Sequence, residues 1–236
     1  MVIFIPNVPC KYQHLIESQR HQFILLHKLI DNEEYRNHYL KLSEKKDKLN
    51  TKYYFILDNS AYEMGESMNA ELLLEWAEKL NVDEIIIPDV YKNMNKTLEY
   101  FYKYSKDERF LKYKLMGVPQ GSNEQEYTFC LMSMLAEDKV KVIGLNKIKK
   151  RDLSLIKTMK QIERIPIYKN KEFHMLGTNN LFEWGLMREI PEIRSADSRV
   201  LAKMITGVDD IWEEELNKTQ LKNLKNLINE VKKWEN

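Results

Sequence analysis

The chain alternates short apolar segments with longer amphipathic segments, and this alternation limits the possible folds more than any other feature of the sequence. Residues 53–57 (YYFIL) are contiguous aromatic and branched residues, typical of a strand that is buried on both faces. Residues 58–61 (DNSA) are small or polar and predict a tight turn. Asn69 is then a suitable N-cap for a helix over residues 70–80, which carries one apolar face. Strands that alternate with helices in this way indicate parallel βα units.

The same pattern recurs along the chain and predicts eight strands, of which the second also fits the middle of a helix. The predicted strands are residues 2–6, 22–26, 53–57, 84–87, 113–118, 140–143, 172–176 and 192–195. The predicted helices are residues 31–48, 70–80, 95–104, 123–134, 152–163, 179–189, a short one that ends near 205, and 218–234.

Eight βα units in 236 residues favour a (β/α)8 TIM barrel, because such a barrel needs ~250 residues. An open doubly wound sheet is the alternative, but no glycine-rich phosphate-binding turn follows the first predicted strand. We therefore expect an α/β fold with a single domain over residues 1–236, in which parallel strands form the barrel and an amphipathic helix over 218–234 ends the chain. That helix is expected to close the barrel, and a homodimer formed through it is the other possibility.

The composition of the chain limits which partners, which cellular location and which metal sites are expected. Lys and Arg number 37 against 36 Asp and Glu, a net charge of +1, so any basic surface for nucleic acid has to be local. No apolar run reaches the ~18 residues of a membrane span, and the N-terminus lacks a charged region before its apolar residues, which predicts a cytoplasmic protein. Cys10 and Cys130 lie far apart and without metal-ligand spacing, so we expect free thiols, no metal site and no cofactor.

The residues that end the predicted strands are those that a barrel would bring to one pocket, at the carboxyl ends of its strands. They are Asp58, Asp89, Gln120, Gly144, Met175 with Gly177, and Asp197. Turns favour Asp and Gly, so each of these residues alone fits a cap or a turn, but six in register are hard to ascribe to turns. Tyr62 lies just beyond Asp58, and Met175 comes from nearly the opposite side, so a flat ring could be held between Tyr62 and Met175.

These residue types match the hydrogen-bonding edge of guanine. A carboxylate can accept from N1–H and from the exocyclic amine together, while an amide and a backbone N–H can donate to a carbonyl oxygen. The remaining carboxylates could act as a nucleophile at an anomeric carbon and as a proton carrier, as in retaining glycoside chemistry.

The series of motifs at the strand ends resembles that of the tRNA-guanine transglycosylases, over about residues 53–199. FILDNSAYE is similar to their DSGGFQ segment, IIIPD to their strand that ends in a base-reading aspartate, and MGVPQGS to their VQGG. VIGLN is similar to their GGL, FHMLG to their YLMG, and RSADSR to the FD-x-x-x-P-T-R segment that carries their nucleophile. The resemblance rests on the order and spacing of all six motifs.

The resemblance implies that guanine leaves a nucleotide and that a 7-deazaguanine base enters. Asp197 would attack C1′, Asp58 would move the proton of the departing and entering bases, and Asp89 would read N1 and the 2-amino group. The other expected contacts come from Gln120 and the Gly144 amide, which would bind the carbonyl oxygen of the base, from Tyr62 and Met175, which would sandwich its ring, and from Asn59, Leu145 and Gly177.

The chain departs from the tRNA enzymes in one large respect, because they carry a Cys3His zinc subdomain late in the chain and this sequence has no cysteine after Cys130. Asn59 and Ala61 also replace Ser and Gly of the first motif, Ile143 replaces the first Gly of GGL, and the Pro after the nucleophile is missing. Without a zinc subdomain, the chain is more similar to the compact, phage-type relatives that insert 7-deazaguanines such as preQ0 into DNA. DNA is therefore favoured over tRNA as the partner.

A nucleic-acid substrate needs cations near the pocket to bind its backbone. The candidates for this role are Lys147, Lys149, Lys150, Arg151, Arg194 and Arg199. The lysine-rich run fits a solvated loop equally well, whereas Arg199 lies two residues after Asp197 and is expected to contact a phosphate. His174 lies inside a predicted strand, points away from its neighbours and is expected to be structural.

Three other functions stay open at this point: an enzyme that acts on RNA, a barrel hydrolase that acts on a small nucleoside, and a non-catalytic subunit that pairs with a catalytic one. The presence of both Asp58 and Asp197 argues against the last, because a subunit without activity has no need of both. Guanine release that requires a polymer would separate the transglycosylase from the hydrolase.

Overall fold

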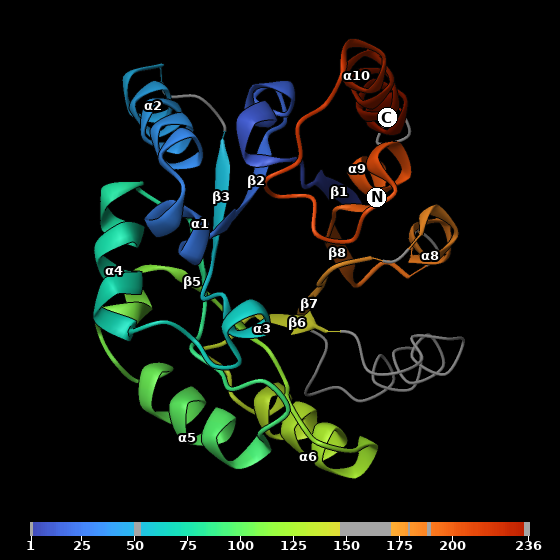
Figure 1. Cartoon of the computed structure of the whole chain (residues 1–236). Coiled ribbons are helices and arrows are strands. Elements are labelled where there is room, and N and C mark those ends of the chain that lie inside the picture. The colour runs from blue at the N-terminus through green and yellow to red at the C-terminus, as the bar shows by residue number, and fades with distance from the viewer. Residues whose placement is uncertain (1, 50–52, 147–170, 179, 188–189, 234–236) are drawn as a thin grey trace.

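The strands form a single sheet that curves into a nearly closed barrel (Figure 1). A computed structural model describes residues 2–49, 53–146, 171–178, 180–187 and 190–233. The strands are β1 (Ile3–Pro6), β2 (His21–Leu25), β3 (Tyr54–Asp58), β4 (Glu84–Ile86), β5 (Lys114–Gly117), β6 (Val142–Leu145), β7 (Glu172–Met175) and β8 (Ile193–Ser198). All paired neighbours are parallel, in the order β1-β8-β7-β6-β5-β4-β3-β2. The predicted (β/α)8 barrel is confirmed, and in the described part of the chain no ladder joins β1 to β2.

Helices surround the strands on the outside of the barrel (Figure 1). They are α1 (Leu26–Asp31), α2 (Glu33–Leu49), α3 (Ala61–Met64), α4 (Ala70–Lys79), α5 (Met94–Tyr104), α6 (Glu124–Leu135), α8 (Leu181–Met187), α9 (Val200–Thr206) and α10 (Lys218–Lys233), with the 3-10 helices η1 (Cys10–Leu15) and η2 (Phe110–Lys112). Asn69, Asn93 and Asn123 cap α4, α5 and α6, because each side chain accepts a hydrogen bond from a backbone N–H of the first turn.

The middle of β3 is continuously apolar because both of its faces are covered. Phe55, Ile56 and Leu57 of β3 are consecutive and all fully buried, so alternate side chains fill the barrel interior and pack beneath the helices. The ambiguous second strand is confirmed as β2, whose register with β3 runs from His21–Tyr54 to Leu25–Asp58.

The main differences from the predicted boundaries lie in three elements. The helix expected over residues 31–48 is divided into α1 and α2, because Asn32 between them has an extended backbone (φ −122°, ψ 114°). Gly144 and Leu145 belong to β6 itself, and Asp197 belongs to β8, so both strands run further toward the carboxyl end of the barrel than predicted. The helix predicted over residues 152–163 lies outside the described residues.

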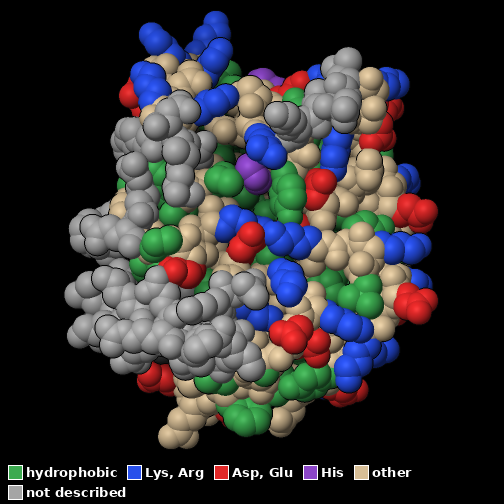
Figure 2. Space-filling view, turned by 180° about the vertical axis from the view of Figure 1, so that it is seen from behind, with side chains coloured by type: hydrophobic (Ala, Val, Ile, Leu, Met, Phe, Trp, Pro, Cys, Tyr) green, Lys and Arg blue, Asp and Glu red, His purple; other side chains and the backbone are tan. Residues whose placement is uncertain are grey.

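The last helix, α10, packs against α9 and β1 and buries Leu224, Ile228 and Val231. Cys10 and Cys130 are both free and buried. Figure 2 shows basic and acidic side chains interspersed over the described part of the face that lies behind Figure 1. Within the described ranges, no helix is long and apolar enough to cross a membrane.

Candidate active site

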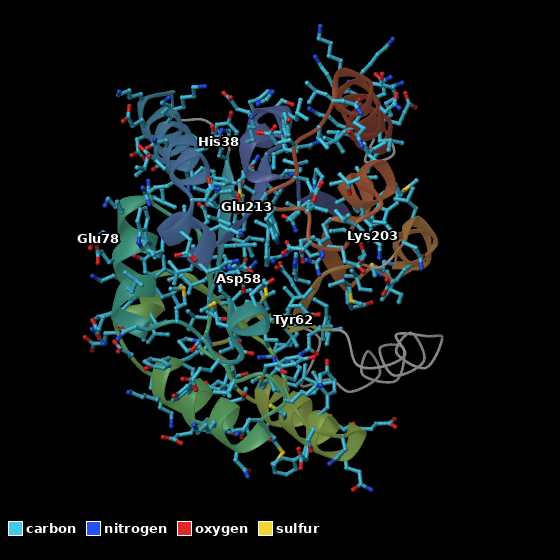
Figure 3. The ribbon with its side chains drawn as sticks, in the orientation of Figure 1. His38, Asp58, Tyr62, Glu78, Lys203 and Glu213 are labelled. Atoms are coloured by element: carbon cyan, nitrogen blue, oxygen red, sulfur yellow. The ribbon has the colours of Figure 1, made fainter. Side chains whose placement is uncertain are left out.

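A cavity of ≈ 130 Å³ opens at the carboxyl ends of the strands. Its walls are formed by Asn7, Phe23, Leu25, Asp58, Asn59, Ala61, Tyr62, Glu63, Ile86, Asp89, Val118, Gln120, Asn146, Leu176, Gly177, Thr178, Asp197, Arg199 and Trp212. In Figure 3, Asp58 lies beside α3 and Tyr62 belongs to it, both near the middle of the molecule, whereas Glu78 lies at its periphery. One water needs roughly 10–15 Å³ of such space, so the cavity has room for a small ring-shaped ligand.

Eight of the residues predicted for the site lie together in these walls. They are Asp58, Asn59, Tyr62, Asp89, Gln120, Gly177, Asp197 and Arg199. They come from the ends of β3, β4, β5, β7 and β8, so residues far apart in sequence share one cavity because parallel strands end at the same rim.

Met175 does not reach the cavity, and the prediction that it covers one face of the ring is wrong. Its neighbour His174 points into the barrel, where it contacts Ser195 and Asp197, and consecutive strand residues point to opposite faces. Met175 is therefore buried in the apolar core, and Leu176 lines the cavity instead.

Gly144 and Leu145, both in β6, also lie outside the cavity walls, contrary to prediction. Gly144 is closely packed, since a Cβ atom there would lie 2.8 Å from Met116 Sδ and 2.9 Å from Val118 Cγ2. Asn146, the next residue along, lines the cavity.

Arg194 lies at the opposite end of the barrel, which contradicts its predicted contact with the nucleic-acid backbone. Its guanidinium binds both oxygens of Glu84 (Nη1–Oε2 2.8 Å, Nη2–Oε1 2.9 Å) and Oε2 of Glu172 (3.1 Å). Glu84 and Glu172 begin β4 and β7, so these ion pairs close the amino-terminal end of the barrel. Lys147, Lys149, Lys150 and Arg151 lie outside the described residues.

A strained turn holds Asp58 at the rim of the cavity. Ser60 follows β3 with a left-handed backbone (φ 63°, ψ 24°), which costs a non-glycine residue roughly 1–3 kcal/mol. His27 holds this conformation, because its backbone N–H donates to Ser60 Oγ (3.1 Å) and its Nδ1 lies 2.8 Å from the same oxygen. Asn59 Oδ1 accepts from the Ala61 N–H (2.8 Å), so the segment between β3 and α3 is fixed at both ends.

Asp58 has a pKa well above its usual range. Burial is the largest cause, followed by the negative charges of Glu63, Asp89 and Asp197. Each of these effects disfavours the charged form of a carboxyl group. Asp58 is partly exposed to the cavity, so it can hold a proton there and exchange it with a ligand.

Asp89 is buried between two amides. Its Oδ1 accepts from Asn59 Nδ2 (2.7 Å), and its Oδ2 accepts from Gln120 Nε2 (2.6 Å). Gln120 is itself oriented by the backbone N–H of Lys92, which donates to its Oε1 (3.1 Å). Burial raises the pKa of Asp89 to about 6, against the opposing effect of the two amide hydrogen bonds. A carboxylate has about four acceptor positions, so two remain for a ligand.

Asp197 is oriented by three donors. Asn7 Nδ2 donates to Oδ2 (2.9 Å), the Gly177 backbone N–H donates to Oδ1 (2.9 Å), and His174 Nε2 lies 3.2 Å from Oδ1. Sequence reasoning missed two of these groups. Asn7 directly follows β1 and could have been found by the rule that identified the other strand ends, whereas His174 was expected to be structural.

Two buried polar atoms of the cavity walls, one after β7 and one after α9, have no hydrogen-bond partner among the described residues. They are Thr178 Oγ1 and Trp212 Nε1, in residues that are only 3% and 6% exposed. Within the described ranges, no set of three His, Cys, Asp or Glu side chains is arranged to hold a metal ion.

No protein-family model matches the chain, and no curated protein matches it.

Proposed function

We propose that the protein is a base-exchange transglycosylase, which replaces guanine in DNA with a 7-deazaguanine base through a covalent bond between Asp197 and the sugar. The observation that carries the proposal is that one cavity holds three aspartates in three different environments. Asp89 is clamped by amides, Asp197 is oriented by three donors, and Asp58 has a raised pKa. Different environments are what allow like residues to take different roles in catalysis.

Asp89 and Gln120 suit the recognition of guanine. Asp89 retains two acceptor positions, which match the N1–H and 2-amino donors of guanine. One N–H of Gln120 Nε2 is used by Asp89, and the other is free to donate to the carbonyl oxygen of the base. Tyr62 and Leu176 line the same cavity and offer surfaces for the two faces of the ring.

The first step forms a bond between a carboxylate oxygen of Asp197 and C1′. The bond between C1′ and N9 breaks, and its electron pair leaves with guanine, which takes the proton of Asp58. In the second step, the entering base returns a proton to Asp58 as its N9 attacks C1′ and releases Asp197. Asp58 must carry a proton at the start, and its raised pKa supports this role.

A polymer is favoured over a free nucleoside because Arg199 lines the cavity beside the nucleophile, where it can bind a phosphate. Among the described residues, Arg199 is the one Lys or Arg side chain in the cavity walls. DNA remains the favoured polymer because the tRNA enzymes that the chain resembles carry a Cys3His zinc subdomain after the barrel motifs, and no cysteine follows Cys130 in this sequence.

The test is the release of labelled guanine from DNA, from tRNA and from free deoxyguanosine, each with and without preQ0. We expect release from DNA that depends on preQ0, together with incorporation of preQ0 in equal amount. Asp197→Asn should abolish release, whereas Asp138→Asn, a matched change at an exposed site, should leave it intact.

Each other outcome identifies a different function. Release from tRNA alone would make the protein an RNA enzyme, and release from deoxyguanosine without preQ0 would make it a nucleoside hydrolase. Tight preQ0 binding without release from any substrate would favour a non-catalytic subunit.

A further inference from the structure

A chain of hydrogen bonds, partly buried at its first step and buried beyond it, runs from the amino-terminal end of the barrel to Asp197. Arg194 Nε donates to Ser195 Oγ (3.2 Å), Ser195 Oγ lies 2.8 Å from His174 Nδ1, and His174 Nε2 lies 3.2 Å from Asp197 Oδ1. Ser195 is 1% exposed and His174 is fully buried, so water cannot substitute for either partner. The His174 ring also lies flat against Phe23 (centroids 5.4 Å apart, planes 3° apart), which restricts its rotation.

The donors at both ends determine where the hydrogens lie. Arg194 Nε can only donate, so Ser195 Oγ accepts from it. Asp197 accepts from the Asn7 amide and the Gly177 backbone N–H, so its carboxylate is an acceptor and His174 Nε2 must carry a hydrogen. If His174 Nδ1 carried one as well, the hydroxyl hydrogen of Ser195 would be buried without an acceptor. The arrangement that satisfies every group is a neutral His174 that accepts from Ser195 and donates to Asp197.

The two oxygens of Asp197 are therefore not equivalent. Oδ1 accepts from both His174 and Gly177, which uses both of its lone pairs. Oδ2 accepts from Asn7, which leaves one lone pair free. A nucleophile attacks through a free lone pair, so the geometry distinguishes Oδ2 as the reacting atom.

We propose that the relay Arg194–Ser195–His174 fixes the tautomer of His174 and so selects Oδ2 of Asp197 as the oxygen that bonds to C1′, with His174 as a positioning residue. The chemical part of this inference rests on the proposed function. The relay matters most when the entering base displaces Asp197. The C1′–Oδ2 bond then breaks, its electron pair returns to the carboxylate, and the charge that spreads to Oδ1 meets the donors His174 and Gly177.

The relay itself is tested without activity, by the 15N resonances of the imidazole ring of His174 at neutral pH. The His174→Gln variant assigns the signal among the five histidines. We expect a hydrogen on Nε2 and none on Nδ1 in the parent, and a mixture of tautomers in the Ser195→Ala variant. A parent His174 with hydrogen on Nδ1, or on both nitrogens, would overturn the relay.

The positioning role is tested by the lifetime of the covalent adduct. The protein is incubated with labelled DNA without preQ0, preQ0 is then added, and loss of the adduct is followed after denaturation. His174→Phe keeps a flat ring against Phe23 but removes the donor, so the adduct should be resolved at least about tenfold more slowly, the effect of one hydrogen bond to a charged group. His174→Gln offers a replacement N–H and should restore most of the parent rate.

The outcomes separate this inference from the proposed function. Parent protein that forms no adduct with DNA or tRNA contradicts the proposed function, while the imidazole resonances still decide the relay. A folded His174→Phe variant that resolves the adduct at the parent rate contradicts the positioning role. That role is also contradicted if His174→Gln is as slow as His174→Phe while both variants unfold at the parent temperature.

Discussion

Replacement of Asp89 by Ala should weaken the binding of guanine and of preQ0 by at least ~30-fold. Asp89 is 3% exposed, and a base bound there would give its N1–H and 2-amino hydrogens to a buried carboxylate. Loss of one partner from a buried charged contact costs about 2–5 kcal/mol, and ~1.4 kcal/mol corresponds to a factor of ten in affinity. The substitution also removes the acceptor of the Gln120 amide (2.6 Å), but from the free and the bound protein alike, so the loss of affinity comes from the contact with the base.

The same contact predicts how binding depends on pH. The base needs the ionised form of Asp89, whose pKa is raised to about 6 in the free protein by burial. Because the pKa of this acid is raised, the competent form is present above pH 6 and is lost as the pH falls through it. The affinity should therefore be roughly tenfold lower at pH 5 than at pH 8, and this difference should disappear in the Asp89→Ala variant.

Calorimetric titration with preQ0 measures both effects. Gln120→Ala removes a neutral donor worth about 0.5–1.5 kcal/mol to the ligand, so its loss in affinity should be the smaller of the two. Asp138→Ala, at an exposed position, serves as the control. If Asp89→Ala binds preQ0 as tightly as the parent does, or if the affinity is the same at pH 5 and pH 8, the assignment of this pocket to a guanine-like base is refuted.

Three further predictions concern the nucleophile, metals and stability. Asp197→Asn should eliminate the covalent adduct seen after denaturation while calorimetry still detects preQ0 binding; an adduct in this variant would remove Asp197 from the role. The protein should need no metal, so its activity should survive chelators. One zinc per chain in elemental analysis would contradict this prediction. Glu84→Ala removes the bidentate partner of Arg194 at a position where Glu84 is fully buried. The free energy of unfolding measured in urea should therefore fall by roughly 3–5 kcal/mol. A fall below about 1 kcal/mol would contradict the buried ion pair.

The order of strands and helices was predictable because local patterns specify it. Contiguous apolar residues such as those of β3 suit strands covered on both faces, and Asn69 and Asn123 mark helix starts through hydrogen bonds within one turn. Once a barrel is inferred, the carboxyl ends of its strands share one rim, so the sequence was enough to assign Asp58 and Asp197 to one cavity.

The face to which each side chain points was decided by the tertiary structure. Strand residues alternate between the two faces, so a prediction that is wrong by one position assigns to the cavity a side chain that lies in the core. This is why Leu176 takes the place predicted for Met175, and why His174 faces Asp197. The boundaries of β6 and β8 depend on pairing with neighbouring strands, which no local pattern records.

Contacts between residues far apart in the chain also cannot be predicted from local sequence patterns. Asn7 and Asp197 are 190 positions apart in the chain and meet because β1 pairs with β8. Arg194 lies three residues before Asp197 in β8, and a strand rises ~3.3 Å per residue. The two side chains therefore lie toward opposite ends of the same strand. The sequence by itself determined the barrel and the acids at its rim, whereas the strand register decided which of their neighbours face them.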